Sequence, residues 1–343
     1  MRSVLAILSG LGILTSIAAA NAADCPGNPD AIGTSRTIAV DPIEHPRLGT
    51  MQYAETLPLA DHEVVLTFDD GPLPPYSNRV LATLSSECVK ATYFIVGSMA
   101  RAYPDVVRKI YAAGHTIGTH SQHHPMNFNT MPLARAESEI DDGIATTAAA
   151  LGNPKALAPF FRIPGFARSS AVEGYVEGRG LMLWSADFPA DDWKHISANE
   201  IVNRAIRRIE AKGRGILLLH DIHGTTADAL PVLLRELKAR GYHIVHVVPA
   251  TAEQPKTATV PQDWQLGRSV HALSRMAKAP IRHAHKGHTF TPAGSSRSET
   301  EPQIIDLPRQ ALNLWQPVSQ PRSKRKIRLM MPIQPATPLV LSN

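Results

Sequence analysis

The chain has 343 residues, of which 43% are hydrophobic, and its formal net charge at pH 7 is +5. A chain of this length and composition can bury a substantial core, which excludes a wholly disordered protein. The positive charge lies in the C-terminal part, because residues 251–343 contain 13 Lys and Arg against 5 Asp and Glu, whereas residues 1–250 contain 22 against 25.

The first 22 residues have the pattern of a secretory signal peptide. Arg2 is followed by an apolar stretch that ends in the small-residue sequence ANA, which is typical of a cleavage site. A membrane anchor is the alternative, but Gly10 and Gly12 interrupt the apolar stretch. We therefore expect cleavage after residues 1–22 and export to the periplasm or the cell exterior, with residues 23–60 as an N-terminal extension of the mature protein.

The chain contains two cysteines, Cys25 and Cys88. After export, both would lie in an oxidising compartment. Either they form a disulfide that ties the extension to the following domain, or both are free thiols.

Residues 61–250 alternate between β-rich and helix-like segments. The predicted strands are EVVLTF, ATYFIVG, HTIGTH, FFRIP, LMLWSA, GILLLH and HIVHVV. Helices are expected over 77–87, 98–113, 132–151, 170–178, 197–212 and 226–240. Because such alternation joins parallel strands through helices, the sequence predicts the α/β class and a single distorted (β/α)-barrel domain of about seven parallel strands.

Residues 251–343 are rich in Pro, Ser, Thr and Gln and show no sustained apolar period, so we expect a disordered basic tail. The run PRSKRKIR within it is either a solvated segment or a contact for an anionic envelope polymer or membrane surface. Every candidate catalytic residue precedes Pro249. A chain ending near Ala250 is therefore expected to keep its activity on small soluble substrates.

The carboxyl ends of the strands of a (β/α) barrel share one face, which carries the chemistry. Ionisable side chains follow five of the predicted strands, and these are Asp69-Asp70, His120, Arg162, Asp187 and His220-Asp221. We expect them to meet at this rim.

His120 and His124 are four residues apart, so on one helical turn both imidazoles project from the same face, as in two-His metal sites. His123, at a spacing of three residues, is the alternative to His124. One carboxylate and two His leave a coordination position open for water on a divalent metal. The adjacent acids Asp69 and Asp70 then divide the work, since one can bind the metal while the other accepts a proton from the water.

The motifs TFDDGP, HSQHH, FRIPGF, WSADFPADDW and LLLHD occur in an order that resembles the polysaccharide deacetylases of carbohydrate esterase family 4, or NodB homology domains. The resemblance covers roughly residues 61–249. It implies that Asp69 is the general base and that Asp70, His120 and His124 hold the metal, usually zinc or another divalent ion.

The resemblance also implies that Arg162 orients Asp69 and that His220 is the general acid. Asp192 would then form a hydrogen bond with His220 and help to keep it protonated. Because this sequence has two extra residues in the fourth motif, Asp191 is the alternative partner of His220.

The loop after Arg162 departs from the family, which usually has Arg-Pro-Pro followed by an aromatic residue and Gly. Here Gly165 precedes Phe166, so the oxyanion donor is expected to be the Gly165 amide. Phe166 and Trp184 are candidates for the walls that contact the acetyl group or a sugar face. Ordinary core aromatics are the alternative for both.

The resemblance implies hydrolysis of N-acetyl groups on a GlcNAc-containing polysaccharide such as a chitooligosaccharide, peptidoglycan or poly-GlcNAc. The alternatives are an O-acetyl esterase acting on xylan, a non-catalytic carbohydrate-binding protein on the same fold, and a metal amidase for small molecules. An acetylated polysaccharide is the predicted partner and no nucleic acid is expected. The sequence leaves the oligomeric state open.

Overall fold

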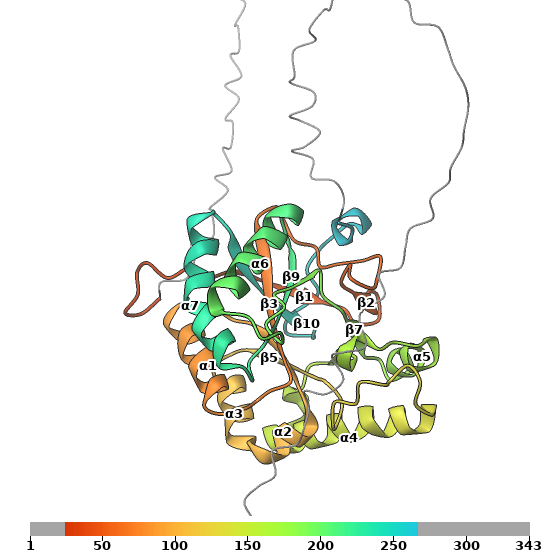
Figure 1. Ribbon diagram of the computed structural model, residues 1–343. Coiled ribbons are helices and arrows are strands. Elements are labelled where there is room, and N and C mark those ends of the chain that lie inside the picture. The colour runs from red at the N-terminus through yellow and green to blue at the C-terminus, as the bar shows by residue number, and fades with distance from the viewer. Residues whose placement is uncertain (1–24, 267–343) are drawn as a thin grey trace, which may run out of the picture. The chain divides into compact units, whose positions relative to one another are not determined.

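A sheet of parallel strands lies at the centre of residues 25–266, which are the residues that this computed structural model describes (Figure 1). Within this range the strands are β1 Thr34–Val40, β2 Arg47–Leu48, β3 Glu63–Asp69, β4 Thr92–Ile95, β5 Thr116–Thr119, β6 Phe160–Phe161, β7 Met182–Trp184, β8 Phe188–Pro189, β9 Gly215–His220 and β10 His243–Pro249. Their order is β1-β10-β3-β4-β5-β6-β7-β2, and β9 pairs with both β3 and β8. The sheet thus curls into the distorted (β/α) barrel that the alternation predicted.

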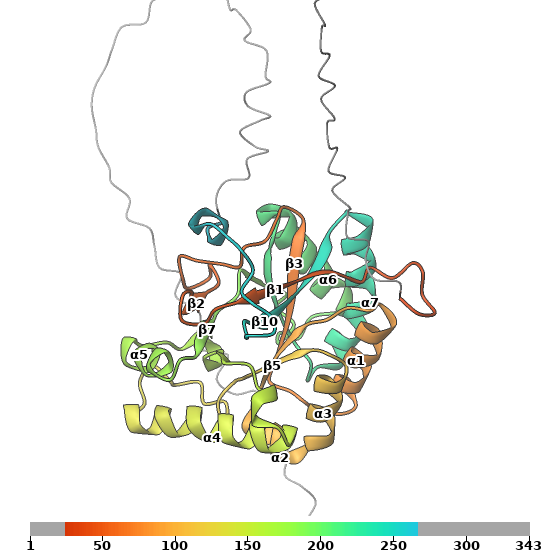
Figure 2. The same cartoon turned by 180° about the vertical axis from the view of Figure 1, so that it is seen from behind.

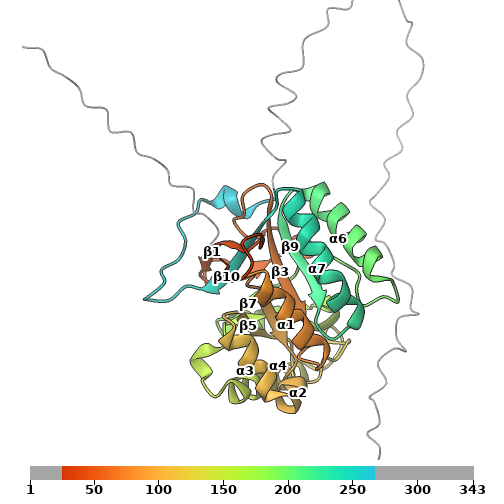
Figure 3. The ribbon, with the colours of Figure 1, turned by 90° about the vertical axis from the view of Figure 1, so that its left-hand side faces the viewer.

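Helices connect the strands and pack on the outside of the sheet (Figures 1 and 3). They are α1 Tyr76–Ser86, α2 Gly97–Ala102, α3 Pro104–Ala112, α4 Leu133–Leu151, α5 Ser170–Gly178, α6 Ala198–Lys212 and α7 Gly224–Ala239, with 3-10 turns η1 Pro154–Ala156, η2 Pro164–Phe166 and η3 Pro261–Trp264. Figure 3 shows α6, α7 and α1 side by side along one flank of the sheet.

Every predicted strand and helix is present, with two kinds of difference. The single helix expected over 98–113 is divided into α2 and α3, because Pro104 has no backbone N–H to continue α2 and instead begins α3. The strands β1, β2 and β8 were not predicted. Two of these have only two residues, which is too short for a period to be recognised.

The two faces of β3, and likewise of β9, pack in different apolar clusters. Val64, Leu66 and Phe68 of β3 pack with the helices, whereas Val65 packs in a second apolar cluster with Leu218 of β9. Because side chains alternate along a strand, Asp69 lies on the same face of β3 as Val65. The last residue of each strand therefore points to the barrel interior, at the end where the strands finish.

The segment 23–60, expected as an extension ahead of the domain, contributes two strands to the sheet. β1 runs parallel to β10, with Thr37 opposite His246 and Val40 opposite Pro249 (Figure 2). β2 pairs with β7 through Leu48 and Trp184.

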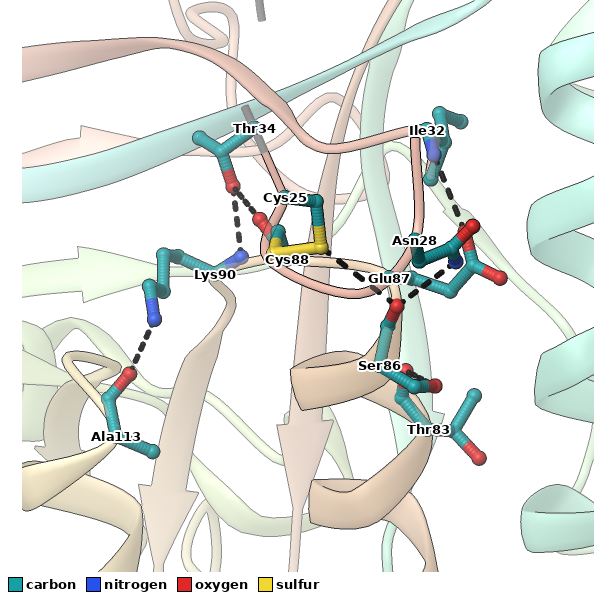
Figure 4. Close-up of a disulfide and its surroundings, with 10 residues drawn as sticks. All are labelled: Cys25, Asn28, Ile32, Thr34, Thr83, Ser86, Glu87, Cys88, Lys90 and Ala113. Atoms are coloured by element: carbon teal, nitrogen blue, oxygen red, sulfur yellow. Dashed lines mark hydrogen bonds between the residues drawn. A yellow bond between two sulfur atoms is a disulfide. The ribbon is translucent and has the colours of Figure 1, made fainter. Parts of the chain in front are cut away.

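Cys25 and Cys88 form a disulfide with a Cα–Cα distance of 5.7 Å (Figure 4). Of the two sequence alternatives, the structure therefore has the bridge. The Asn28 side-chain Nδ2 donates to the Ser86 carbonyl at 2.9 Å, and the Ile32 backbone amide donates to the Glu87 carboxylate at 3.1 Å. The start of the described chain is thus fastened to the end of α1 by one covalent bond and several polar contacts.

Replacing both cysteines with serine is expected to lower the free energy of unfolding by about 2–4 kcal/mol, because the bridge closes a loop between positions separated by 63 residues. Denaturant unfolding of the wild type with and without a reducing agent measures the same difference. The serine variant is the control, since reductant should leave its midpoint unchanged. Equal midpoints for oxidised wild type and variant would contradict the expectation.

The tail was expected to start at residue 251, whereas the structure keeps residues 251–266 on the domain. Trp264 is 3% exposed and stacks on the His45 ring with centroids 3.3 Å apart. The Thr257 hydroxyl accepts a hydrogen bond from the Ala39 amide at 2.9 Å. One buried aromatic residue, surrounded by polar sequence, is enough to anchor this segment and gives no periodic signal.

A chain shortened to Leu266 is therefore expected to be more stable than one shortened to Ala250. Loss of a buried Trp typically costs about 3–5 kcal/mol. Thermal unfolding of the two shortened chains gives the comparison, and Trp264→Ala in the longer one tests whether this side chain accounts for the difference. Identical melting temperatures would show that residues 251–266 add nothing to the fold.

The predicted signal peptide and the tail beyond residue 266 lie outside the described residues. Within residues 25–266, none of the helices combines the length and the apolar character that a membrane crossing requires.

Candidate metal centre

The two adjacent acids follow the inward-facing end of β3. Asp69 is the last residue of β3 and lies opposite His220, the last residue of β9, in the strand register. Asp70 then turns the chain with a left-handed backbone (φ 73°), and Gly71 follows. Gly71 is required here, because a Cβ at this position would lie 2.1 Å from the buried Asp221 carboxylate. Both carboxylates lie near His120, but Asp70 also lies beside His124, whereas Asp69 contacts Arg162.

Asp70, His120 and His124 form a cluster that fits a divalent metal. One potential ligand atom from each residue lies within 4.8 Å of the other two. The Asp70 Oδ1 atom is 3.4 Å from His120 Nε2 and 3.2 Å from His124 Nε2. Within residues 25–266 this buried oxygen has no hydrogen-bond partner. A carboxylate and two imidazoles that converge in this way are a typical zinc ligand set.

The second nitrogen of His120 is held by the backbone. His120 Nδ1 is 2.6 Å from the Arg162 carbonyl oxygen, which can only accept, so Nδ1 carries the proton and Nε2 is free to bind a metal. Burial lowers the pKa of His120 to about 4, which favours the neutral ligand form. Burial opposes ionisation of Asp70, but His124 outweighs it and holds the pKa of Asp70 well below its usual range.

His124 rather than His123 lies beside Asp70. The His123 side chain is 59% exposed, and its Nδ1 contacts Glu139 Oε1 of α4 at 3.0 Å. The His123 amide also donates to Glu139 Oε2 at 2.8 Å. Burial opposes protonation of His124, but the nearby Asp70 carboxylate outweighs it and raises the pKa of His124.

Helix α4 supports the loop that carries these histidines. A Cβ at Gly143 would lie 2.6 Å from the Ser121 carbonyl carbon, so only glycine allows α4 to approach the loop this closely. The Ser121 hydroxyl accepts a hydrogen bond from the His124 amide at 3.0 Å, and His124 has a left-handed backbone (φ 57°). The expected helical turn is replaced by a bend that brings both imidazoles to the same point.

Asp69 is bonded to a fully buried arginine. Arg162 Nη1 donates to Asp69 Oδ1 at 2.6 Å and to the Thr67 hydroxyl at 2.9 Å. Arg162 Nη2 donates to the Ser185 carbonyl at 2.9 Å, and the guanidinium lies 4.1 Å from the centre of the Phe94 ring. Asp69 Oδ2 is 3.7 Å from His120 Nε2. Arg162 thus holds Asp69 Oδ1 in place, while Asp69 Oδ2 lies near His120 of the candidate metal site.

His220 is paired with Asp192, the candidate expected from the sequence. His220 Nδ1 lies 2.8 Å from Asp192 Oδ1, and the His220 amide donates to Asp192 Oδ2 at 2.7 Å. The Thr226 hydroxyl donates to the same Oδ2 atom at 2.7 Å. Burial disfavours the imidazolium, but Asp192 outweighs it and raises the pKa of His220 to about 10.

Asp191, the alternative partner, points to a different set of side chains. Its Oδ2 atom accepts hydrogen bonds from Arg204 at 2.8 Å and Arg208 at 2.9 Å. Burial opposes ionisation, but these arginines outweigh it and lower the pKa of Asp191 to about 2. The open choice between the two acids is therefore decided by geometry in favour of Asp192 as the neighbour of His220.

The expectation that Asp187 lies at the reactive rim is wrong. Its Oδ2 atom accepts the Ile216 amide at 2.8 Å, at the start of β9, whereas His220 lies at the end of that strand. The chain turns after β7 and enters β8, where Phe188 pairs with Leu217. The Thr50 amide donates to Asp187 Oδ1 at 2.8 Å. Asp187 thus binds the N-terminal segment at the opposite end of β9.

The three substrate-binding candidates have different environments. Gly165 is exposed, with a left-handed backbone (φ 57°), and Phe166 is half-buried. Trp184 is 1% exposed and packs against Phe94 and Phe160, so the alternative of a core aromatic fits it and a sugar-stacking surface does not. Trp184 is the last residue of β7, and the inward-facing side chains of this strand are apolar.

Trp193, for which the sequence predicts no role, also lies at this site. Its side chain is 42% exposed, and its ring centre is 5.5 Å from that of His220. Trp193 therefore presents an exposed aromatic surface beside His220. The Asp-Trp dipeptide in the fourth motif was the available signal.

The fold and the site together define a (β/α) barrel whose Asp70, His120 and His124 could hold one metal ion, and comparison with known proteins specifies the family. The model described as polysaccharide deacetylase matches residues 57–183. A peptidoglycan-N-acetylglucosamine deacetylase of Bacillus cereus is 33% identical over 189 residues, which cover 54% of this chain and 85% of that protein. The chain belongs to the polysaccharide deacetylase family.

Other relatives match this chain over only part of their own length. A peptidoglycan-N-acetylglucosamine deacetylase of Listeria monocytogenes is 32% identical over 184 residues, which cover 54% of this chain but only 38% of that protein. Among solved structures, a peptidoglycan deacetylase of Bdellovibrio bacteriovorus is 30% identical, with a TM-score of 0.56 over 64% of this chain and 60% of that one.

Proposed function

We propose that this protein is an exported, metal-dependent deacetylase that removes N-acetyl groups from GlcNAc units, with peptidoglycan as its polysaccharide. The observation that carries the proposal is the meeting of three units at one rim, namely the Asp70-His120-His124 cluster, the Asp69–Arg162 pair and the His220–Asp192 pair. The names of the relatives support peptidoglycan as the polymer. The disulfide supports an oxidising compartment.

Asp70, His120 and His124 would hold the divalent ion, for which zinc fits the donor set. A bound ion of this type polarises a carbonyl oxygen and lowers the pKa of water. Asp69 accepts a proton from the water that attacks the acetamide carbon, while Arg162 keeps the Asp69 carboxylate in place. The Gly165 amide is the proposed donor to the oxygen that becomes negative.

His220 then donates a proton to the amide nitrogen as the C–N bond breaks, which releases acetate and leaves a free amine on the sugar. Asp192 favours the protonated form of His220 by its charge and its hydrogen bond. The two acid–base groups thus belong to neighbouring strands, with Asp69 at the end of β3 and His220 at the end of β9.

Acetate release from peptidoglycan, chitooligosaccharides, poly-GlcNAc and acetylated xylan tests the proposal, with the Asp69→Asn variant as the catalytic control. Release from the N-acetylated glycans, and most from peptidoglycan, is expected. Release from xylan alone would replace the proposal with an O-acetyl esterase. Glycan binding without release from any polymer would indicate a carbohydrate-binding protein.

Replacing His124 with Ala is expected to remove most of the bound metal, whereas His123→Ala is the matched control and should retain it. Only His124 of the two contacts Asp70, while the exposed His123 side chain contacts the buried Glu139. Metal analysis of the purified proteins after dialysis against dilute zinc gives the stoichiometry. Full metal content in the His124 variant, or its loss in the His123 variant, would contradict the ligand set.

A further inference from the structure

The loop that carries Gly165 and Phe166 has two consecutive residues in the left-handed region, with φ of 57° and 55°. Glycine adopts this region freely, but a bulky residue such as Phe166 rarely does, because its side chain makes the conformation strained. Such a conformation persists only where surrounding contacts hold it. The contacts to the Phe166 backbone therefore identify what maintains the loop.

Among the described residues, three hydrogen bonds reach the Phe166 backbone. Two are local, since the Phe166 amide donates to the Ile163 carbonyl at 3.1 Å and the Arg168 amide donates to the Phe166 carbonyl at 2.9 Å. The third comes from Gln52, whose Nε2 donates to the Phe166 carbonyl at 2.8 Å across a sequence separation of 114 residues. Gln52 thus supplies the hydrogen bond that joins the Phe166 backbone to a distant part of the described chain, while the Phe166 side chain packs against the second apolar cluster.

Gln52 is itself rigidly placed. The Gln52 backbone amide donates to the Gly49 carbonyl at 3.1 Å, and the neighbouring Met51 backbone amide donates to the Ala186 carbonyl at 2.9 Å. The Tyr53 hydroxyl donates to Glu173 Oε1 at 3.0 Å. The segment around Gln52 is therefore fastened on both sides and can serve as a fixed support for the Gly165-Phe166 loop.

We propose that Gln52 is a positioning residue, which holds the Gly165-Phe166 loop in the left-handed conformation that the reaction uses. The inference rests on the proposed function. Through the Phe166 carbonyl, Gln52 sets the direction of the Gly165 amide and of the Phe166 side chain. The family model matches only from residue 57, so this support comes from the segment ahead of the matched region.

The variants Gln52→Glu, Gln52→Ala and Gln52→Lys test the proposal, with Met51→Ala as the control. Glutamate has the shape of glutamine but no donor, whereas the lysine ammonium restores one. We expect Gln52→Glu and Gln52→Ala to lower kcat roughly 3- to 10-fold, which is the rate equivalent of one lost hydrogen bond, with little change in KM. Gln52→Lys should recover most of the loss, and Met51→Ala should match the wild type.

Hydrogen exchange of the amides in residues 163–168, measured without substrate, reports the loop directly. It should become faster in Gln52→Glu and Gln52→Ala but not in Gln52→Lys, at unchanged metal content. Wild-type exchange and wild-type kcat in Gln52→Glu would overturn the proposal, as would failure of the lysine variant to recover. If the wild type released no acetate from any glycan, the proposed function would fail, and the exchange data would still decide whether Gln52 holds the loop.

Discussion

Replacing Asp69 with Asn is expected to leave the metal bound and to lower turnover by about 10²–10⁴-fold. The amide has the shape of the carboxylate and keeps an oxygen that can accept from Arg162, which donates to Asp69 at 2.6 Å. It cannot accept a proton from water. Because Asp69 is not one of the three clustered ligands, the metal should remain. Metal analysis and acetate release on the same preparation test both parts.

The matched control is Asp70→Asn. This change removes a charged ligand, so metal affinity should fall first, and added zinc should restore part of the rate. Comparing the two variants separates the role of general base from that of metal ligand, since either Asp69 or Asp70 could in principle have either role. A metal-free Asp69→Asn protein, or one with near wild-type turnover and metal bound, would refute the assignment of Asp69 as base.

Replacing Asp192 with Asn is expected to move the alkaline limb of the pH profile to lower pH and to reduce turnover at neutral pH by about 10²–10⁴-fold. His220 is active as an acid only while protonated. Burial alone lowers its pKa, whereas Asp192 raises it to about 10 in the wild type. Without that carboxylate the pKa falls, so protonated His220 and activity should recover only as the pH is lowered.

The control for this experiment is Asp191→Asn. Asp191 is adjacent in sequence but bonds Arg204 and Arg208, so its loss should leave the alkaline limb in place. Rates measured from pH 5 to 10 at saturating metal give both profiles. An unchanged limb in Asp192→Asn, or equal shifts in the two variants, would show that Asp192 does not control the protonation of His220.

The positions of the candidate catalytic side chains could be predicted from the sequence because these side chains lie where strands end. The runs EVVLTF and GILLLH are long and apolar enough to be recognised as strands, and parallel strands bring their carboxyl ends together. Asp69 and His220 were therefore expected to meet before any geometry was known. The family resemblance supplied the roles, which spacing alone leaves open.

The errors arose where position depends on tertiary contacts. The apolar run LMLWSA predicts one strand that ends next to Asp187, whereas β7 ends at Trp184 and the chain then starts β8. The support from Gln52 has no local signal, since its partner is 114 residues away. The segment 251–266 was assigned to the tail because a single Trp in a polar stretch shows no period.

The pairing of β1 with β10 joins the beginning of the described chain to residues near its end, and this affects the order of folding. β1 has no partner until residues 243–249 have been synthesised and, on the proposed route, exported. Cys25 and Cys88 are far closer in sequence, so their bridge can form while the sheet is still incomplete. The long-range strand pair is then a late and slow step, because closing the larger loop costs more chain entropy. Until that step, an unpaired β1 is an open edge to which another chain could add.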